Sequence, residues 1–151
     1  MVRSAGVNVA AARKRLGAWG FDYRPDFTPA EAGLNCFINW TKEFVGKAAA
    51  QKQKTEPQAR KLVTMAIDVD GIDVSNEEAI LKDGQALGHI SLGGYAHHVG
   101  RLVAMGYVST EHSASGTRLE VEVEVEVLGY LYLAKVQGTA LYDPSGGRLR
   151  G

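Results

Sequence analysis

One glycine-rich stretch holds the side chains best suited to contact a ligand. Residues 93–101 read Gly-Gly-Tyr-Ala-His-His-Val-Gly-Arg. An aromatic ring, two imidazoles and a guanidinium on flexible backbone suit contact with a flat heterocycle, and the same glycines suit a tight turn. No helix signal follows, so the stretch does not predict a loop that cradles phosphate. Taken alone, the residues favour the turn.

Other reactive residue types lack the partners that catalysis needs. The sequence has no Gly-x-Ser-x-Gly elbow, and Cys36 has no accompanying motif. His97 and His98 are adjacent, so on a strand they would point to opposite faces and could not chelate one metal ion. The alternate glutamates of residues 117–128 are typical of a solvated strand face. We therefore expect neither a catalytic residue nor a metal site.

Composition indicates an ordinary soluble domain. The chain has 151 residues, 45% of them hydrophobic and 23% charged, and a net charge of zero. The single Cys36 excludes an internal disulfide and suits a reducing compartment, so a cytoplasmic location is expected. No apolar run approaches the roughly 20 residues of a membrane span. The basic run Arg13 to Arg15 predicts a solvated helix end, so we expect neither a nucleic-acid nor a membrane partner.

The first third of the chain predicts short helices. Residues 4–17 favour a helix, Thr28 to Glu31 form a capping-box pattern, 35–40 could be a strand, and 43–54 favour a second helix. The polar stretch around Pro57 marks a boundary, which predicts a helical segment over 1–57 and a second domain over 58–151. This segment looks too short to own a core, and its aromatic residues predict a homodimer or a partner that covers Trp19, Phe27, Phe37, Trp40 and Phe44.

The remainder predicts antiparallel strands. Strand patterns cover 60–68, 101–110, 117–128 and 130–136, and Asp83-Gly84 divides 79–90 into a hairpin. Alternation places one set of side chains inward (Val121, Val123, Val125, Val127) and the other outward (Glu120, Glu122, Glu124, Glu126). The fold class predicted is mainly β: a C-terminal antiparallel β-barrel of jelly-roll or Greek-key type, preceded by a short α-rich segment.

Six phrases occur in an order that resembles a known family. They lie at residues 17–22, 28–34, 43–47, 82–84, 92–108 and 141–150. Together they resemble the folate-dependent aminomethyltransferase family, which includes the T protein of the glycine cleavage system and the C-terminal regions of dimethylglycine and sarcosine dehydrogenases. The resemblance covers roughly residues 12–150, and the Tyr-Asp-Pro phrase at 142–144 looks more like the dehydrogenase-fused branch.

The resemblance implies a role in one-carbon metabolism. In that family three domains surround a channel for tetrahydrofolate, which accepts a one-carbon unit from an amine. Residues 58–151 would be the C-terminal barrel, and 1–57 a remnant of the folate-binding region. The catalytic aspartate belongs to an N-terminal portion expected to lie outside this chain, so we expect no activity from it alone. A folate-domain or flavin-domain partner chain is implied. The corresponding cofactor-binding residues are Tyr95, His97, Arg101 and Tyr142.

The chain departs from the family pattern at three places. Arg13 takes the place of a glutamate that binds the pterin, Asn39 that of a basic residue, and Leu128-Gly129-Tyr130 that of a basic turn. The resemblance therefore predicts that tetrahydrofolate binds weakly, or only with a partner domain. The alternative function is a non-catalytic assembly or small-molecule-binding module that reuses the same barrel.

Overall fold

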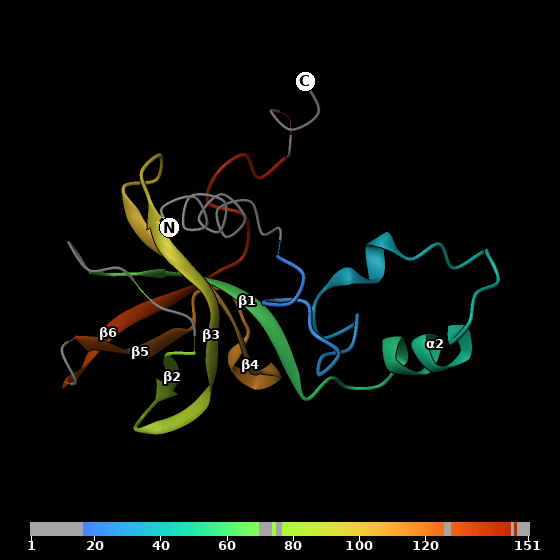
Figure 1. Ribbon diagram of the computed structural model, residues 1–151, viewed down its shortest axis with the longest axis horizontal. Helices are drawn as coiled ribbons and strands as arrows, with labels where there is room; N and C mark the ends of the chain where they lie inside the picture. Colours follow the sequence, from blue (N-terminus) through green and yellow to red (C-terminus); the bar gives the residue numbers. More distant parts are fainter. Residues whose placement is uncertain (1–16, 70–73, 75–76, 126–127, 146, 148–151) are drawn as a thin grey trace.

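Six antiparallel strands close into a barrel in the computed structural model, which describes residues 17–69, 74, 77–125, 128–145 and 147 (Figure 1). The strands are β1 (Arg60–Ile67), β2 (Ala79–Lys82), β3 (Gln85–Ala96), β4 (Arg101–Ser109), β5 (Arg118–Val125) and β6 (Leu128–Gln137). Their order around the barrel is β1-β4-β3-β2-β5-β6. Because β2, β3 and β4 follow as hairpins and β1 returns beside β4, the connectivity is a Greek key. The predicted antiparallel barrel is confirmed.

The hairpin predicted at Asp83-Gly84 is present. Lys82 pairs with Gln85, so the loop has two residues. Both loop residues have positive φ, 52° at Asp83 and 75° at Gly84. That conformation matches the right-handed twist of the flanking strands, which explains why an Asp-Gly pair could mark this turn.

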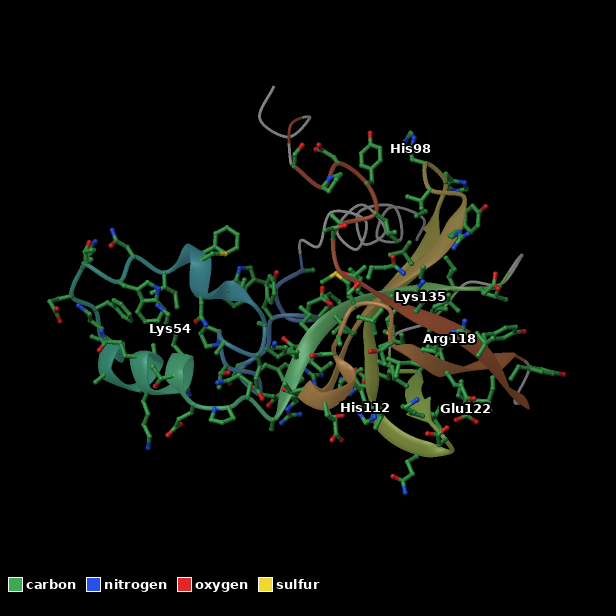
Figure 2. The ribbon with its side chains drawn as sticks, turned by 180° about the vertical axis from the view of Figure 1, so that it is seen from behind. Lys54, His98, His112, Arg118, Glu122 and Lys135 are labelled. Atoms are coloured by element: carbon green, nitrogen blue, oxygen red, sulfur yellow. The ribbon has the colours of Figure 1, made fainter. Side chains whose placement is uncertain are left out.

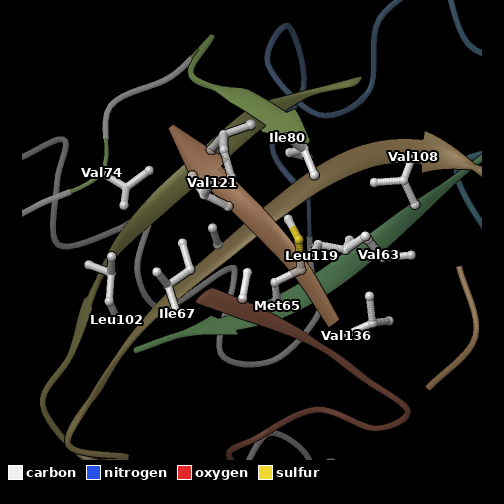
Figure 3. Packing of buried hydrophobic residues seen from close by; sticks show 13 residues of the cluster. Val63, Met65, Ile67, Val74, Ile80, Leu102, Val108, Leu119, Val121 and Val136 are labelled. Carbon is white, nitrogen blue, oxygen red and sulfur yellow. The ribbon is translucent and has the colours of Figure 1, made fainter. Parts of the chain in front are cut away.

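The barrel interior holds the main hydrophobic core (Figure 3). Alternate residues of β1 point inward, with Met65 fully buried and Ile67 1% exposed. On β5 Leu119 and Val121 are buried, whereas Glu122 is exposed, so the predicted inward valine and outward glutamate are confirmed there. The predictions for the other valines and for Glu124 and Glu126 fall outside the described side chains. A one-residue slip of β5 would bury carboxylates, and this fixes the register.

The segment from Gly17 to Gly33 packs against the barrel and carries the predicted capping box. The Glu31 amide donates to Thr28 Oγ1 at 3.2 Å, and the Thr28 amide donates to the Glu31 carboxylate at 2.9 Å. Gly33 ends the turn with φ of 72°, a conformation that costs glycine little. The Leu62 amide of β1 donates to the Glu31 carbonyl at 2.9 Å, which ties the turn to the barrel.

The next stretch extends away from the barrel (Figure 1). It contains the short 3₁₀ helix η1 (Leu34–Phe37) and the helix α2 (Lys47–Thr55), and neither has a buried residue. The predicted strand at 35–40 is wrong, because the stretch begins within η1 and the Ile38 amide donates to the nearby Asn35 carbonyl. The helix predicted at 43–54 exists but begins at Lys47.

The helix predicted at 4–17 lies almost entirely outside the described residues. In the described ranges, no helix has the length and apolar character needed to cross a membrane.

Candidate functional site

The tip of the β3–β4 hairpin brings two predicted site residues together. Tyr95 is the next-to-last residue of β3, and His97 follows the strand in a four-residue turn that ends at Gly100, where φ is 67°. The Tyr95 and His97 rings meet edge to face, with centroids 5.0 Å apart and 73° between their planes. Tyr95 is half-buried against the core, whereas His97 is exposed. The hairpin thus holds one fixed ring and one accessible imidazole.

The C-terminal segment adds a second ring pair at the same tip. Tyr142 stacks on His98, which Figure 2 labels, with centroids 5.4 Å apart and 28° between the planes. The family resemblance implied His97 and did not include His98, and the argument that adjacent strand residues diverge was used only against a metal site shared by the two. Both histidines lie in the turn after β3, so this argument does not apply to them. The adjacent imidazoles were themselves the signal that could have identified His98.

Arg101, the fourth predicted residue, lies in different surroundings. It begins β4, and its side chain is exposed. It lines a shallow pocket of about 320 Å³ together with residues of β1, β5 and β6. Tyr95, His97 and Tyr142 are not among the described residues that line this pocket. The four predicted site residues therefore divide: Tyr95, His97 and Tyr142 belong to the group of rings at the hairpin tip, whereas Arg101 lines a separate pocket.

A buried polar cluster, Asp22, Ser91 and Tyr107, joins the N-terminal segment to β3 and β4. Asp22 is fully buried and accepts hydrogen bonds from the Ser91 hydroxyl and, at 2.8 Å, from the Ala18 amide. The Tyr107 hydroxyl donates to the Asp22 carbonyl at 2.8 Å. Burial raises the pKa of Asp22, although these two hydrogen bonds oppose the shift, and burial likewise raises the pKa of Tyr107.

Sequence reasoning did not single out this cluster. Its only signal was Asp22 at the end of an aromatic and glycine-rich phrase, which does not reveal contact with strands about 70 residues away. These hydrogen bonds connect the N-terminal segment to β3 and β4, so the cluster anchors the segment to the barrel.

The described residues also bear on metal ligands and on the two positions that depart from the family pattern. Among the described residues, no three His, Cys, Asp or Glu side chains gather as metal ligands. The Asn39 side-chain oxygen accepts from the Thr41 amide at 3.1 Å and from the Thr41 hydroxyl at 2.7 Å. Asn39 is thus occupied by a local turn, and Arg13 lies outside the described residues.

The architecture defines the class as a closed Greek-key barrel with an aromatic hairpin tip. The glycine cleavage T-protein C-terminal barrel domain matches residues 60–143, which is more than half of the chain. The chain belongs to this family. The solved structure of glycine cleavage system aminomethyltransferase T from Bartonella henselae superposes over 91% of this chain and 38% of that one, with a TM-score of 0.80 and 20% identity. That similarity supports the fold.

Curated relatives include two kinds of enzyme. Dimethylglycine dehydrogenase, mitochondrial, from Mus musculus is 32% identical over 148 residues, covering 95% of this chain and 17% of the relative. Aminomethyltransferase from Natranaerobius thermophilus is 33% identical over 110 residues, covering 72% of this chain and 30% of the relative. The chain therefore spans between about a sixth and a third of the length of these relatives.

Proposed function

We propose that this chain is the C-terminal barrel of a tetrahydrofolate-linked protein of the aminomethyltransferase or dimethylglycine dehydrogenase type. It would close one side of a folate site and would not carry out the one-carbon transfer itself. Family membership and the similarity to dimethylglycine dehydrogenase and aminomethyltransferase support this proposal. The expected division at residue 57 is part of the proposal and is supported by the start of β1 at Arg60 and by the absence of buried residues in η1 and α2.

The main support for a ligand-facing surface is the ring cluster at the hairpin tip, formed by Tyr95, His97, His98 and Tyr142. Two ring pairs, Tyr95 with His97 and His98 with Tyr142, gather where β3 turns into β4. A pterin is flat and rich in donors and acceptors, so stacking rings with polar edges suit it. Arg101 would meet the anionic tail, since a guanidinium can bind a carboxylate through two parallel hydrogen bonds.

A second candidate function is a non-catalytic module that uses the barrel for assembly or for binding a small molecule. The observation that favours it is Asn39, whose side chain is engaged by Thr41 where the family places a basic residue. Under either function the partners proposed are a folate-domain or flavin-domain chain, or a second copy of this chain. The exposed Cys36 suits a reducing compartment, and we propose the cytoplasm.

Calorimetric titration of the full chain with tetrahydrofolate tests the ligand-facing surface. We expect weak binding that Tyr95→Ala or Tyr142→Ala reduces by about tenfold, because base–aromatic stacking contributes roughly 1–3 kcal/mol. Tyr130→Ala is the matched control, since Tyr130 is half-exposed and lies on β6. Tight binding that neither variant weakens would place the site elsewhere. Equal loss in the Tyr130→Ala control would show a general effect on folding.

The same purified protein can be used to test whether the chain alone catalyses aminomethyl transfer. General acid–base catalysis requires a positioned side chain, and the catalytic aspartate implied by the family has no counterpart assigned in these residues. We expect no aminomethyl transfer above a heat-inactivated control. Turnover by the purified 151-residue chain would contradict the proposal.

A further inference from the structure

Three basic residues from three strands meet at the pocket that Arg101 lines. Arg101 begins β4, Arg118 begins β5, and Lys135 lies near the end of β6. Each alternates with a buried core residue: Leu102, Leu119 and Ala134 all belong to the barrel interior. Because successive strand residues point to opposite faces, the three basic side chains point outward. They line a pocket of about 320 Å³, to which Ile67 and Ala134 of the core also contribute.

The strand register forces two of these cations together. Arg118 pairs directly with Lys135 across β5 and β6, and Figure 2 shows the two beside each other. Like charges in directly opposed positions destabilise a sheet. The positions of Arg118 and Lys135 are fixed, because the strand register that pairs them also buries their neighbours Leu119 and Ala134 in the core. The fold therefore keeps an unfavourable contact that it could avoid with a neutral residue at either position.

Among the described residues, none of the three cations forms an ion pair within 4.0 Å, although Asp68 lines the same pocket and Glu120 lines a neighbouring one with Arg118. Asp68 is the one acidic residue among the described lining residues, against three basic ones, so the lining has a formal excess of two positive charges. The pocket thus has a net positive lining, which would attract an anion.

The lining also indicates what size and shape of anion would bind. Leu133 and Ala66 add apolar surface to the lining, and Gln137 adds a side-chain amide. A volume near 300 Å³ is at the lower end of small-molecule sites. Guanidinium groups bind carboxylate and phosphate oxygens through two parallel hydrogen bonds, while an ammonium acts as a point charge.

We propose that Arg101, Arg118 and Lys135 form a binding site for a small anion that carries two or more carboxylate or phosphate groups. Binding would neutralise the opposed Arg118 and Lys135 and offset the cost of placing them together. The site is separate from the ring cluster, and it does not depend on a pterin. Arg101 is the one residue shared with the proposed folate surface.

Titration of the full chain with pyrophosphate and, separately, with citrate tests the site at low ionic strength. We expect saturable binding with a stoichiometry of one. Lys135→Gln and Arg118→Gln should each weaken it about 10- to 150-fold, the range of a hydrogen bond between charged groups. Lys61→Gln is the matched control, because Lys61 is exposed on β1 and does not line the pocket. Binding of pyrophosphate alone would identify phosphate as the preferred group, and binding of citrate alone would identify carboxylate.

A thermal unfolding series without ligand provides a second readout. Lys135→Gln removes the like-charge contact, so its melting temperature should equal or exceed that of the wild type, whereas pyrophosphate should raise the wild-type value more than the variant value. The proposal is overturned if neither anion binds saturably, or if Lys61→Gln weakens binding as much as Lys135→Gln. Neither probe contains a pterin, so a failure to bind tetrahydrofolate leaves this result unaffected.

Discussion

The ring of Phe27 stacks on the ring of Tyr107, with centroids 3.5 Å apart and 9° between the planes. Phe27 belongs to the N-terminal segment and Tyr107 to β4, so this contact joins the segment to the barrel. The guanidinium groups of Arg60 and Arg24 lie 5.0 Å and 5.5 Å from the Phe27 ring centroid. Stacking and cation–π contacts at one ring, together with the hydrogen bond from the Tyr107 hydroxyl to Asp22, hold the segment in place.

Tyr107→Phe should destabilise the protein by about 1–3 kcal/mol. The substitution keeps the stack on Phe27 but removes the hydroxyl that donates to the Asp22 carbonyl, leaving a buried acceptor without that donor. Urea unfolding measures the change. Tyr130→Phe serves as the control and should change the unfolding free energy by less than about 0.5 kcal/mol, because Tyr130 is half-exposed. Equal effects of the two substitutions would contradict the assigned role of the Tyr107 hydroxyl.

Asp22 should make stability fall as pH rises from the acid range. Its pKa in the folded protein lies above the ordinary value of 3.8, because burial disfavours the charged carboxylate. The unfolded chain therefore releases this proton first, and the stabilisation present below pH 3.8 is lost as pH rises through the folded pKa. Asp22→Asn cannot titrate. Wild type should lose stability relative to this variant from pH 3.8 upward, measured by urea unfolding across a pH series. A constant difference would contradict the raised pKa.

Gly88→Ala should cost about 3 kcal/mol or more. A Cβ atom at Gly88 would lie 1.8 Å from the Tyr107 carbonyl oxygen, so the backbone of β3 or β4 must move. Gly129→Ala is the control, since its nearest atom, at 2.5 Å, is the carboxylate end of the exposed Glu122, which can rotate away. Thermal or urea unfolding compares the two. Similar stability of both variants would contradict the close contact between Gly88 of β3 and the Tyr107 carbonyl of β4.

The aromatic side chains of the first third should promote self-association. Trp19 is 83% exposed and Phe37 is 76% exposed, whereas Phe27 is buried by Tyr107. Exposed apolar surface of this kind marks an interaction site. We expect sedimentation or light scattering to show a dimer that Trp19→Ser combined with Phe37→Ser weakens at least tenfold. Leu131→Ser, an exposed position on β6, is the control. A strict monomer, or a dimer sensitive only to Leu131→Ser, would contradict this prediction.

Features that depend on neighbouring residues could be predicted from the sequence. The hairpin at Asp83-Gly84, the capping box from Thr28 to Glu31 and the alternation of β5 all follow from short-range rules of backbone conformation and side-chain period. The strand predicted at 35–40 was wrong because a strand needs a partner, and the amides there bond within their own turns. The residue pattern of a short segment does not show whether another strand lies beside it.

Contacts between distant residues were decided only by the tertiary structure. Closing the barrel pairs β1 with both β4 and β6, and this register places Arg101, Arg118 and Lys135 around one pocket although they are far apart in the sequence. The same closure brings Ser91 and Tyr107 to Asp22, and the C-terminal segment brings Tyr142 to His98. Hydrogen bonding between non-local strands sets these positions, and side-chain burial selects one register among the alternatives. The sequence pattern was sufficient for the barrel strands and for the inward Val121, because both follow from residue types and their period, whereas the pairing of distant strands decided which outward side chains line one pocket.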